Sequence, residues 1–421
     1  MSASYLGTRF IWGQDAPVVI DDVDRRRHTY LIGQTGTGKT TLLKQLILQD
    51  IAKGGGVGVI DPHGDLVEEL LDYIPRARTK DVVYFNPADL DYPIGFNPLE
   101  RVHPDRQSLV ASNVIATLKS IWGDVWGTGR MQYITRHTLL SLLEYEHGTL
   151  LGVNRLLSHD GFREHVLRRV TNPAVRAFWR DEFARYDKGE RIAAAAAIQN
   201  KAGQFTTDAL MRNILGQVKS TINLRYMMDT RRILLANLSK GRLGEDNSNL
   251  LGSLLVSQLQ LAAQERASVP EAHRVDFALY IDEFQNFTTD SFASILSEAR
   301  KYRLCLTLAH QYLDQLPANL HKAVFGNVGT LLAFRVGTVD AEVLSQHFQP
   351  YPPPALVELD RYTACLRLLQ HGEISEPFVL TTSLPNTPRY GRKDTLIRVS
   401  RERFGRPRAA VEDKITRWLK H

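Results

Sequence analysis

The sequence predicts an α/β protein in which a mainly parallel sheet has helices on both faces and carries an inserted all-α domain. Three observations support this fold class. Apolar runs of strand length alternate with helical periodicity in the first hundred residues, and the alternation resumes after residue 231. Between about residues 104 and 227, helical periodicity dominates and strand signals are few. A glycine-rich loop also joins one apolar strand directly to the helix that follows it.

Length and composition indicate an ordinary globular protein of several domains. The chain has 421 residues, which suggests two or three domains, and it is 43% apolar and 23% charged. Cys305 and Cys365 match no metal-ligand spacing and form no disulfide framework, which favours a reducing compartment. We find no signal peptide and no apolar run long enough to span a bilayer. We therefore expect a cytoplasmic protein, which a partner could hold at the inner membrane.

The first hundred residues begin the sheet. The segment before residue 28 is predicted to form short strands and turns, and three glycines at 54–56 end the first long helix. The expected elements are strands at 18–20, 28–33, 57–60 and 82–85, and helices at 40–52 and 66–74. Strands that alternate with helices in this way pair in parallel.

The middle of the chain is predicted to be helical, and the sheet continues after it. Five consecutive alanines at 193–197 favour a helix strongly. The helices expected in this block lie at 110–121, 131–146, 162–170 and 174–186. Further strands are expected at 233–238, 277–281, 304–309, 330–336 and 364–369, with helices at 249–267 and 291–302 and one more from residue 340.

The strongest functional signal is a complete phosphate-binding loop between the strand at 28–33 and the helix at 40–52. Such a turn aims backbone N–H groups inward, and the helix adds its N-terminal dipole. Lys39 can reach the β and γ phosphates of a nucleotide, and the Thr40 hydroxyl can ligate Mg²⁺. We therefore predict a P-loop NTPase fold of the RecA-like type. ATP or GTP would be bound by Gly33, Gln34, Thr35, Gly36, Thr37, Gly38, Lys39, Thr40 and Thr41.

Acidic and amide side chains follow two other predicted strands. The strand at 277–281 ends in Asp282, which would hold the Mg²⁺ hydration shell, and Glu283, which would orient or deprotonate the attacking water. Gln311 stands after the strand at 304–309, where an amide could sense the γ-phosphate or position water. The alternative for each is a polar strand end without a catalytic role.

Two further features have weaker signals. Arg300 or Arg303 could enter the site of a neighbouring subunit as an arginine finger, although a basic helix end also favours the helix dipole alone. His63 follows the strand at 57–60, at the edge where open α/β sheets bind ligands. We expect His63 to be a structural hydrogen-bonding residue rather than a base.

The distribution of charge suggests an anionic partner. The net charge is +6, and residues 384–421 hold eleven Lys or Arg against four Asp or Glu. Candidate DNA contacts in the helical block are Arg191, Lys201, Arg212 and Lys219. Phosphate contacts need only Lys, Arg and amides at a surface, and no base-reading motif is evident, so binding should not depend on base sequence.

Taken together, the motifs resemble the HerA/FtsK superfamily of nucleic-acid pumping ATPases. Within it the chain looks most like the coupling-protein branch, the motor ATPases of conjugative type IV secretion. The resemblance covers nearly the whole chain. It is carried by the loop at 33–41, Asp-Pro-His-Gly-Asp at 61–65, Ser-Lys-Gly-Arg at 239–242, Ile-Asp-Glu-Phe-Gln-Asn-Phe at 281–287, the run at 297–311 and Phe-Gly-Asn-Val-Gly-Thr at 325–330.

The resemblance implies a ring, usually a homo-hexamer, with ATP sites between subunits and DNA in a central channel. Lys39, Thr40, Asp282 and Glu283 match the Walker residues of the family. Gln311 matches its sensor glutamine. Arg300, eleven residues earlier, matches the place of the arginine that acts on the neighbouring subunit, and we favour it over Arg303. The inserted helical domain is similar to the one that caps the ring where DNA and the relaxosome enter.

One departure from the family keeps two functions open. Conjugative members usually carry N-terminal membrane helices, whereas this chain starts almost at the first motor strand, which puts a direct membrane anchor in doubt. The leading hypothesis is an ATP-driven DNA translocase, acting with a secretion channel or relaxosome. The alternative is a HerA-like regulatory ATPase ring that acts with a partner nuclease or other effector. A nucleotide-binding scaffold is a third reading, and the intact Glu283 argues against it.

These expectations divide the chain into four ranges. Residues 1–100 would form the first part of a nucleotide-binding domain, with the phosphate loop, and residues 101–230 the inserted helical domain. Residues 231–383 would complete the nucleotide-binding domain with the acidic strand end and Gln311. Residues 384–421 would form a basic C-terminal tail.

Overall fold

The computed structural model describes residues 3–100, 102–123, 129–289, 292–384 and 386–420. Its internal contacts divide the chain into two compact units. The first, which we call the α/β unit, contains Met1–Phe85, Leu224–Ser239 and Leu259–Val399. The second, the helical unit, contains Asn86–Asn223, Lys240–Gln258 and Ser400–His421. The division of the chain into four domain ranges, which the sequence suggested, stays a prediction. Each of the two units is described by itself.

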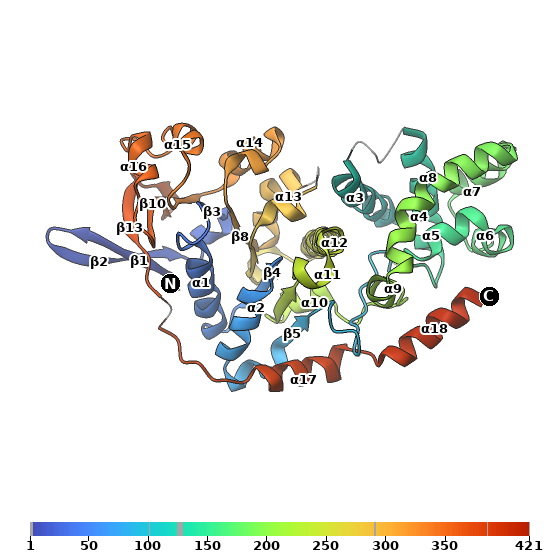
Figure 1. Cartoon of the computed structure of the whole chain (residues 1–421), viewed down its shortest axis with the longest axis horizontal. Helices are drawn as coiled ribbons and strands as arrows, with labels where there is room; N and C mark the ends of the chain where they lie inside the picture. Colours follow the sequence, from blue (N-terminus) through green and yellow to red (C-terminus); the bar gives the residue numbers. More distant parts are fainter. Residues whose placement is uncertain (1–2, 101, 124–128, 290–291, 385, 421) are drawn as a thin grey trace. The chain divides into compact units, whose positions relative to one another are not determined.

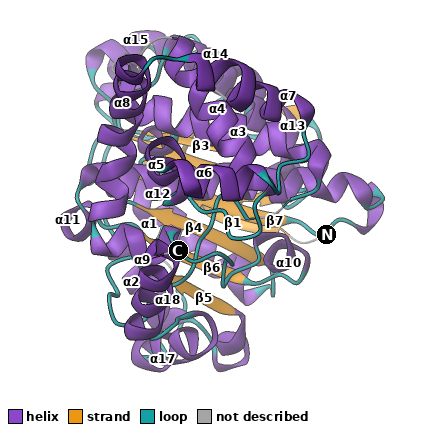
Figure 2. Ribbon diagram, turned by 90° about the vertical axis from the view of Figure 1, so that its right-hand side faces the viewer, coloured by secondary structure: helices purple, strands orange, loops and turns teal. Residues whose placement is uncertain are grey.

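One large sheet organises the α/β unit (Figure 2). In the described residues it has eleven strands, in the order β2-β1-β13-β10-β9-β3-β8-β7-β4-β6-β5. Their bounds in chain order are β1 (Ala3–Ile11), β2 (Gln14–Asp21), β3 (Thr29–Ile32), β4 (Gly56–Asp61), β5 (Val82–Phe85), β6 (Ile233–Asn237), β7 (Phe277–Ile281), β8 (Leu304–His310), β9 (Thr330–Ala333), β10 (Thr363–Arg367) and β13 (Phe378–Thr381). A separate short pair consists of β11 (Leu369–Gln370) and β12 (Glu373–Ile374).

The strands from β9 to β5 in the sheet order are parallel, which confirms the predicted α/β fold class. Every residue of β3, β4 and β6 is buried, as expected for strands covered on both faces. The sequence missed the antiparallel extension, in which β10, β13, β1 and β2 pair in turn. The β1–β2 hairpin is the long ribbon at the left of Figure 1, and its turn residues Trp12 and Gly13 both have positive φ.

The chain path places helices on both faces of the parallel strands. The connections from β3 to β4 and from β4 to β5 step along the sheet in one direction, and those from β7 to β8 and from β8 to β9 step in the other. Because such crossovers are right-handed, helices on oppositely directed steps cover opposite faces. The helices of this unit are α1 (Lys39–Ala52), α2 (Asp65–Leu70), α10 (Leu224–Asp229), α13 (Phe292–Glu298), α14 (Ala318–Asn327), α15 (Thr338–Leu344) and α16 (Pro353–Val357).

The core of the α/β unit lies between the sheet and α1 and α2. Leu42, Leu46 and Ile47 of α1 are almost fully buried in a cluster with Val59 of β4 and Leu235 of β6. The apolar residues recur at helical spacing, as the sequence predicts. At the base of this layer, Arg25 donates two hydrogen bonds to the buried Asp50, at 2.6 and 2.9 Å. This buried ion pair anchors α1 to the turn before β3.

The helical unit is built from helices in the residues that the structure describes. The sequence predicts helices for most of residues 104–227. The observed helices are α3 (Pro104–Trp122), α4 (Gly129–Glu144), α5 (Gly152–Ser158), α6 (Asp160–Leu167), α7 (Pro173–Ala177), α8 (Lys188–Thr207), α9 (Ala209–Leu215), α11 (Lys240–Leu243) and α18 (Arg408–Lys420). The single helix expected at 174–186 is instead α7 followed by a π turn and a 3₁₀ turn. Two helices, α12 (Glu245–Gln264) and α17 (Lys393–Phe404), run from one unit into the other along the chain.

The basic C-terminal range contains the helices α17 and α18. Val411 and Ile415 of α18 are buried in a cluster with Leu151, and the partly buried Trp418 packs against them. These positions are spaced four and three apart, which places them on one face of the helix. The charge excess of this range therefore lies on helices whose apolar faces are covered.

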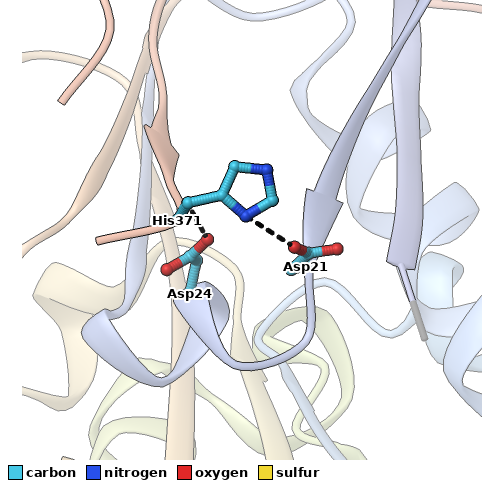
Figure 3. A group of neighbouring side chains, drawn as sticks. All are labelled: Asp21, Asp24 and His371. Carbon is cyan, nitrogen blue, oxygen red and sulfur yellow. Dashed lines mark hydrogen bonds and ion pairs between the residues drawn. The ribbon is translucent and has the colours of Figure 1, made fainter. Parts of the chain in front are cut away.

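A group of two aspartates and one histidine lies near the β11–β12 turn (Figure 3). Asp24 accepts the backbone N–H groups of His371 and Gly372, at 2.7 and 3.2 Å, and His371 Nδ1 lies 3.5 Å from an oxygen of Asp21. His371 and Gly372 both have positive φ, as a two-residue hairpin turn requires. Since each Asp24 oxygen already accepts a backbone N–H, the group stabilises this turn.

No helix in the described ranges is long and apolar enough to cross a membrane.

Candidate functional site

The phosphate loop follows β3 and keeps its shape through glycine. Gly33 and Gly38 have φ of +156° and +127°, and a Cβ on Gly33 would lie 2.7 Å from the Cβ of Phe334. A Cβ on Gly38 would lie 3.1 Å from Phe334 and from Tyr362. The backbone N–H of Tyr362 donates to the Thr37 carbonyl at 2.7 Å. The loop is therefore pressed against its neighbours, and larger residues do not fit at these two glycines.

The remaining loop residues divide into an exposed and a buried set. Gln34, Thr35 and Gly36 are exposed at the tip. Thr37 is buried, and its hydroxyl donates to the Gln34 carbonyl at 2.7 Å. Thr41 is half-buried within α1.

The first turn of α1 is open to an anion. Its N-cap is Gly38, and no side chain caps the helix. The first helical residue is Lys39, whose positive charge opposes the helix dipole unless an anion lies nearby. Lys39 Nζ donates to the carbonyls of Gly33 and Gln34, and burial lowers the pKa of its ammonium group against the opposing effect of Glu283 and Asp282. Uncapped N–H groups and a buried cation together fit a phosphate group.

The Asp282 carboxylate lies beside the helix start. Its Oδ2 accepts a hydrogen bond from the Thr40 hydroxyl at 3.4 Å, and the residue is 6% exposed. Burial, together with the negative charges of Glu283 and Asp61, raises the pKa of Asp282 to about 7. A hydroxyl oxygen and a buried carboxylate are the kind of oxygen groups that a hydrated Mg²⁺ ion binds.

Amide side chains from two elements hold Glu283. Its Oε1 accepts from Gln311 Nε2 at 2.9 Å, and its Oε2 accepts from Gln285 Nε2 at 2.7 Å. Glu283 itself has φ of +46°, in the left-handed region that non-glycine residues seldom adopt. Such local strain concentrates at functional sites. Each carboxylate oxygen is thus oriented by a separate donor.

Sequence reasoning missed Gln285 as a site residue. The left-handed turn at Glu283 folds the chain back, so that the amide two residues later reaches the carboxylate. The signals were its place two residues after Glu283 and its position in the segment at 281–287 that carries the family resemblance. Periodicity predicts no left-handed residue at Glu283.

Gln311 is positioned by the end of β8 and the turn after it. Its backbone N–H donates to Gln315 Oε1 at 3.1 Å. The preceding His310 is fully buried and hydrogen-bonds through Nε2 to the Tyr30 hydroxyl of β3. Burial lowers the pKa of His310 to about 3, so the ring is neutral at physiological pH. The backbone of Gln311 and the side chain of the residue before it are therefore held by hydrogen bonds to Gln315 and Tyr30.

The end of β4 and the segment after it contain a buried carboxylate and an exposed histidine. Asp61 is 1% exposed, and its two oxygens accept the backbone N–H groups of His63 and Val67, at 2.8 and 3.1 Å. The His63 side chain is exposed. Asp61 thus holds the start of α2 and adds negative charge near Asp282. The role of the His63 side chain stays a prediction.

The two candidate arginines differ in their surroundings. Arg303 has φ of +58° and lies 3.8 Å from Asp276 and 3.9 Å from Glu271. The Arg300 side chain is exposed and forms no ion pair within the described part of the chain. Both precede β8, whereas Gln311 follows it, and seven strand residues span roughly 23 Å at about 3.3 Å each. Arg300 therefore lies far from the phosphate loop of its own chain.

The four candidate DNA contacts of the helical unit also differ. Arg191 donates to the carbonyls of Tyr186 and Ala184, and Arg212 makes long hydrogen bonds to the carbonyls at 206 and 207. Lys201 lies 5.1 Å from the centre of the Trp122 ring. Lys219 is exposed. Three of these cations thus have local partners within the unit.

Comparison with protein families gives two matches. Residues 8–241 match the family described as "Helicase HerA, central domain", which is more than half of the chain. Residues 276–348, which include Asp282, Glu283, Arg300 and Gln311, match the family described as "TraM recognition site of TraD and TraG". No curated protein is similar enough to count as a match.

Several solved structures share the fold at low sequence identity. The unbound bacterial conjugative coupling protein TrwBdeltaN70 is 14% identical, with 91% of this chain and 90% of that chain covered and a TM-score of 0.62. The coupling protein TrwB in complex with ADP and Mg²⁺ is 15% identical, with 92% of each chain covered and a TM-score of 0.62. VirB4 of Thermoanaerobacter pseudethanolicus is 14% identical, with 93% and 98% covered and a TM-score of 0.64.

Proposed function

The chain belongs to the family of the HerA helicase central domain, and from that premise we propose that it is an ATP-driven DNA translocase of the conjugative coupling-protein type. The observation that carries the proposal is one sheet edge that gathers Lys39, Thr40, Asp282, Glu283 and Gln311 within a single chain. Coupling proteins and VirB4 share the fold, and residues 276–348 match a segment of TraD and TraG.

The phosphate loop would hold the nucleotide. Backbone N–H groups of residues 33–41 would bind the phosphates, with Lys39 at the β and γ positions. Thr40 would ligate Mg²⁺, and Asp282 would hold its hydration shell. Bound Mg²⁺ would neutralise negative charge that develops between the β and γ phosphates. The same charge would keep Asp282 ionised, because a cation nearby lowers the pKa that burial raises.

Glu283 would accept a proton from the attacking water or orient it. Its oxygens are held at 2.7 and 2.9 Å by Gln285 and Gln311, so the carboxylate has little freedom to rotate. A positioned base of this kind contributes about a hundred- to ten-thousand-fold in rate. Gln311 would also respond to the γ-phosphate, because it bonds the base and stands at the adjacent strand end.

Arg300 would complete the site of a neighbouring subunit. It is exposed, and it lies at the edge of the sheet opposite its own phosphate loop. An exposed arginine that cannot reach its own nucleotide can stabilise transition-state charge only in another copy. Catalysis would therefore need an assembly, which in this family of motors is a homo-hexameric ring with DNA in its channel.

DNA would be bound through its backbone. The helical unit and its C-terminal helices carry much of the basic excess. Contacts of this kind are insensitive to base sequence and weaken steeply with salt. A secretion channel or relaxosome component would be the partner in transfer.

The HerA family match also supports a second function. The ring would then be a regulatory ATPase whose main output is the activation of a partner nuclease or other effector. The two functions differ in what the isolated protein does with DNA.

ATPase rates measured with no DNA, with single-stranded DNA and with double-stranded DNA separate these functions. We expect strong stimulation of the isolated protein by DNA, and loss of all hydrolysis in a Lys39→Ala variant. A Lys39→Ala variant that still hydrolyses ATP would overturn the catalytic assignment. Hydrolysis that DNA leaves unchanged, and that a partner nuclease stimulates, would favour the regulatory function.

A further inference from the structure

The helical unit contains a hollow of about 770 Å³, and none of its lining residues belongs to the proposed nucleotide site. Two chain segments and α18 surround it, and all its lining residues belong to this unit. Its volume lies in the range of preformed ligand sites, roughly 300 to 1,000 Å³. Because of its charge, described next, we call it the basic hollow.

Three cations from different segments line the basic hollow. They are Lys219 in the loop after α9, Arg406 between α17 and α18, and Lys414 on α18. All three are exposed, and none forms an ion pair within the described ranges of the chain. The one acidic lining residue, Glu146, lies 3.8 Å from its neighbour His147. The hollow therefore has an excess of uncompensated positive charge.

The floor of the hollow is apolar. Val411, Ile415 and Trp418 form the inward face of α18, and Val218 adds another aliphatic side chain. An apolar floor beneath a cationic rim favours a ligand with an apolar anchor and flanking negative charges.

Hydrogen bonds within the unit fix the walls of the hollow. The Thr221 N–H donates to the Gly95 carbonyl at 2.9 Å, and Asn97 Nδ2 donates to the Val218 carbonyl at 2.8 Å. The Arg406 N–H donates to the Pro93 carbonyl at 3.2 Å. Little ordering is needed when a partner binds walls that are already fixed.

Nucleic acid fits this hollow less well than a peptide. Single strands bind on exposed aromatic faces, and Trp418 is the one Phe, Tyr or Trp side chain in the lining. The guanidinium of Arg155 lies 5.2 Å from the centre of the Trp418 ring, and Phe162 packs edge-on against it at 5.5 Å. A base therefore has little aromatic surface on which to stack.

We propose that the basic hollow is a docking site for an acidic, amphipathic segment of a partner protein. An apolar side chain of that segment contacts the α18 floor, and its carboxylates pair with Lys219, Arg406 and Lys414. This proposal does not depend on nucleotide binding, so it stands or fails separately from the ATPase.

The test uses the full chain and a fluorescein-labelled synthetic peptide built from Glu-Glu-Leu-Leu repeats. Fluorescence anisotropy gives its affinity without nucleotide, at low and at moderate salt. We expect saturable binding that weakens with salt, and a decrease of about tenfold or more in the variant with Lys219→Glu, Arg406→Glu and Lys414→Glu, since three charge pairs are lost. The same peptide with Lys in place of Glu should not bind.

Two matched controls separate docking from general attraction. Reversal of three exposed arginines elsewhere on the unit, Arg168→Glu, Arg169→Glu and Arg185→Glu, should leave peptide binding unchanged. Ala410→Trp should fill the hollow without a change of charge and weaken binding, whereas Ala409→Trp, next to it and outside the lining, should not. Circular dichroism would establish that each variant is folded.

Three outcomes would overturn the proposal. One is no binding of the acidic peptide, and another is equal loss in both triple variants. The third is a labelled oligothymidylate that binds the wild type more tightly than the peptide and loses affinity on reversal of the hollow cations, which would assign the hollow to nucleic acid.

Discussion

The two edges of the parallel sheet are built in opposite ways. At the carboxyl edge, Lys39, Asp282 and Glu283 are buried. Lys39 donates a hydrogen bond to the Gly33 carbonyl, and Glu283 accepts one from Gln311. At the amino edge, Arg300 is exposed and has no ion-pair partner among the described residues. One edge therefore gathers buried polar groups, and the other has an exposed cation.

This difference is what the proposed division of the site between subunits requires. A buried polar group that is left unsatisfied costs about 1 to 3 kcal/mol, and the buried groups of the carboxyl edge already have hydrogen-bond partners in their own chain. An exposed arginine has no such need, so it can serve a neighbour. The predictions below test this contrast, and they run from the largest expected effect to the smallest.

Among the substitutions that leave the phosphate loop intact, removal of the exposed cation should have the largest effect on hydrolysis. Arginine fingers contribute about a thousand-fold or more to the rate, so Arg300→Ala should reduce kcat by that factor and leave ATP binding intact. Lys301→Ala, which removes the adjacent exposed charge, is the matched control. Steady-state ATPase assays with DNA measure both, and similar rates in the two variants would contradict the assignment.

Removal of the base at the buried edge should be next in size. Glu283→Gln keeps the shape of the side chain and removes its negative charge, so kcat should fall about a hundred-fold or more while nucleotide still binds. Glu342→Gln, at an exposed position on α15, should have no effect. Equal affinity for a fluorescent ATP analogue in Glu283→Gln and wild type would show that only the chemical step is lost.

Loss of one of the two amides on Glu283 should have a smaller effect. Gln285→Ala removes a hydrogen bond to a carboxylate, worth about 1.5 kcal/mol or more, which corresponds to roughly tenfold in kcat. The KM for ATP should not change, because Gln285 has no part in phosphate binding. An increase in KM with unchanged kcat would instead give Gln285 a role in the ground state.

The amino edge should be sensitive to acid. His28 Nε2 donates to the Leu296 carbonyl at 3.1 Å, and its Nδ1 accepts the Leu306 N–H at 3.1 Å, so the ring must be neutral. Burial lowers the pKa of His28 to about 4 from its ordinary value near 6.5. Its contribution to stability is present above pH 6.5 and is lost as the pH falls towards 4, by up to about 3 kcal/mol.

Chemical denaturation at pH 7 and pH 5 measures this loss. His28→Gln, which has both a donor and an acceptor but does not titrate, should show a smaller difference between the two pH values than the wild type. An identical difference in both proteins would mean that other groups cause the acid sensitivity.

The sequence predicted the groups that lie next to strand ends, because their place follows from the order of the strands. Lys39, Asp282, Glu283 and Gln311 all follow parallel strands, and parallel strands end at one edge. Their catalytic roles stay predictions. Gln285 could not be predicted, since it reaches Glu283 only through a left-handed residue.

Parts of the fold that depend on long-range pairing were also missed. β1 and β13 are far apart in the chain and pair antiparallel, with Thr8 opposite Thr381. The C-terminal helix α18 was not among the predicted elements, because the excess of Lys and Arg over Asp and Glu dominates the sequence of residues 384–421. Its Val411 and Ile415 gain their significance only from the surface of the helical unit on which they pack.

A mixture of two inactive variants tests the divided site most directly. Lys39→Ala cannot use its own loop but keeps Arg300, and Arg300→Ala keeps a complete loop but lacks the exposed cation. In mixed rings, an Arg300→Ala subunit can receive the arginine of a Lys39→Ala neighbour. We predict that DNA-stimulated ATPase activity returns on mixing and reaches its maximum near equal proportions. Mixtures that stay as inactive as the separate variants, although they assemble together, would contradict the account.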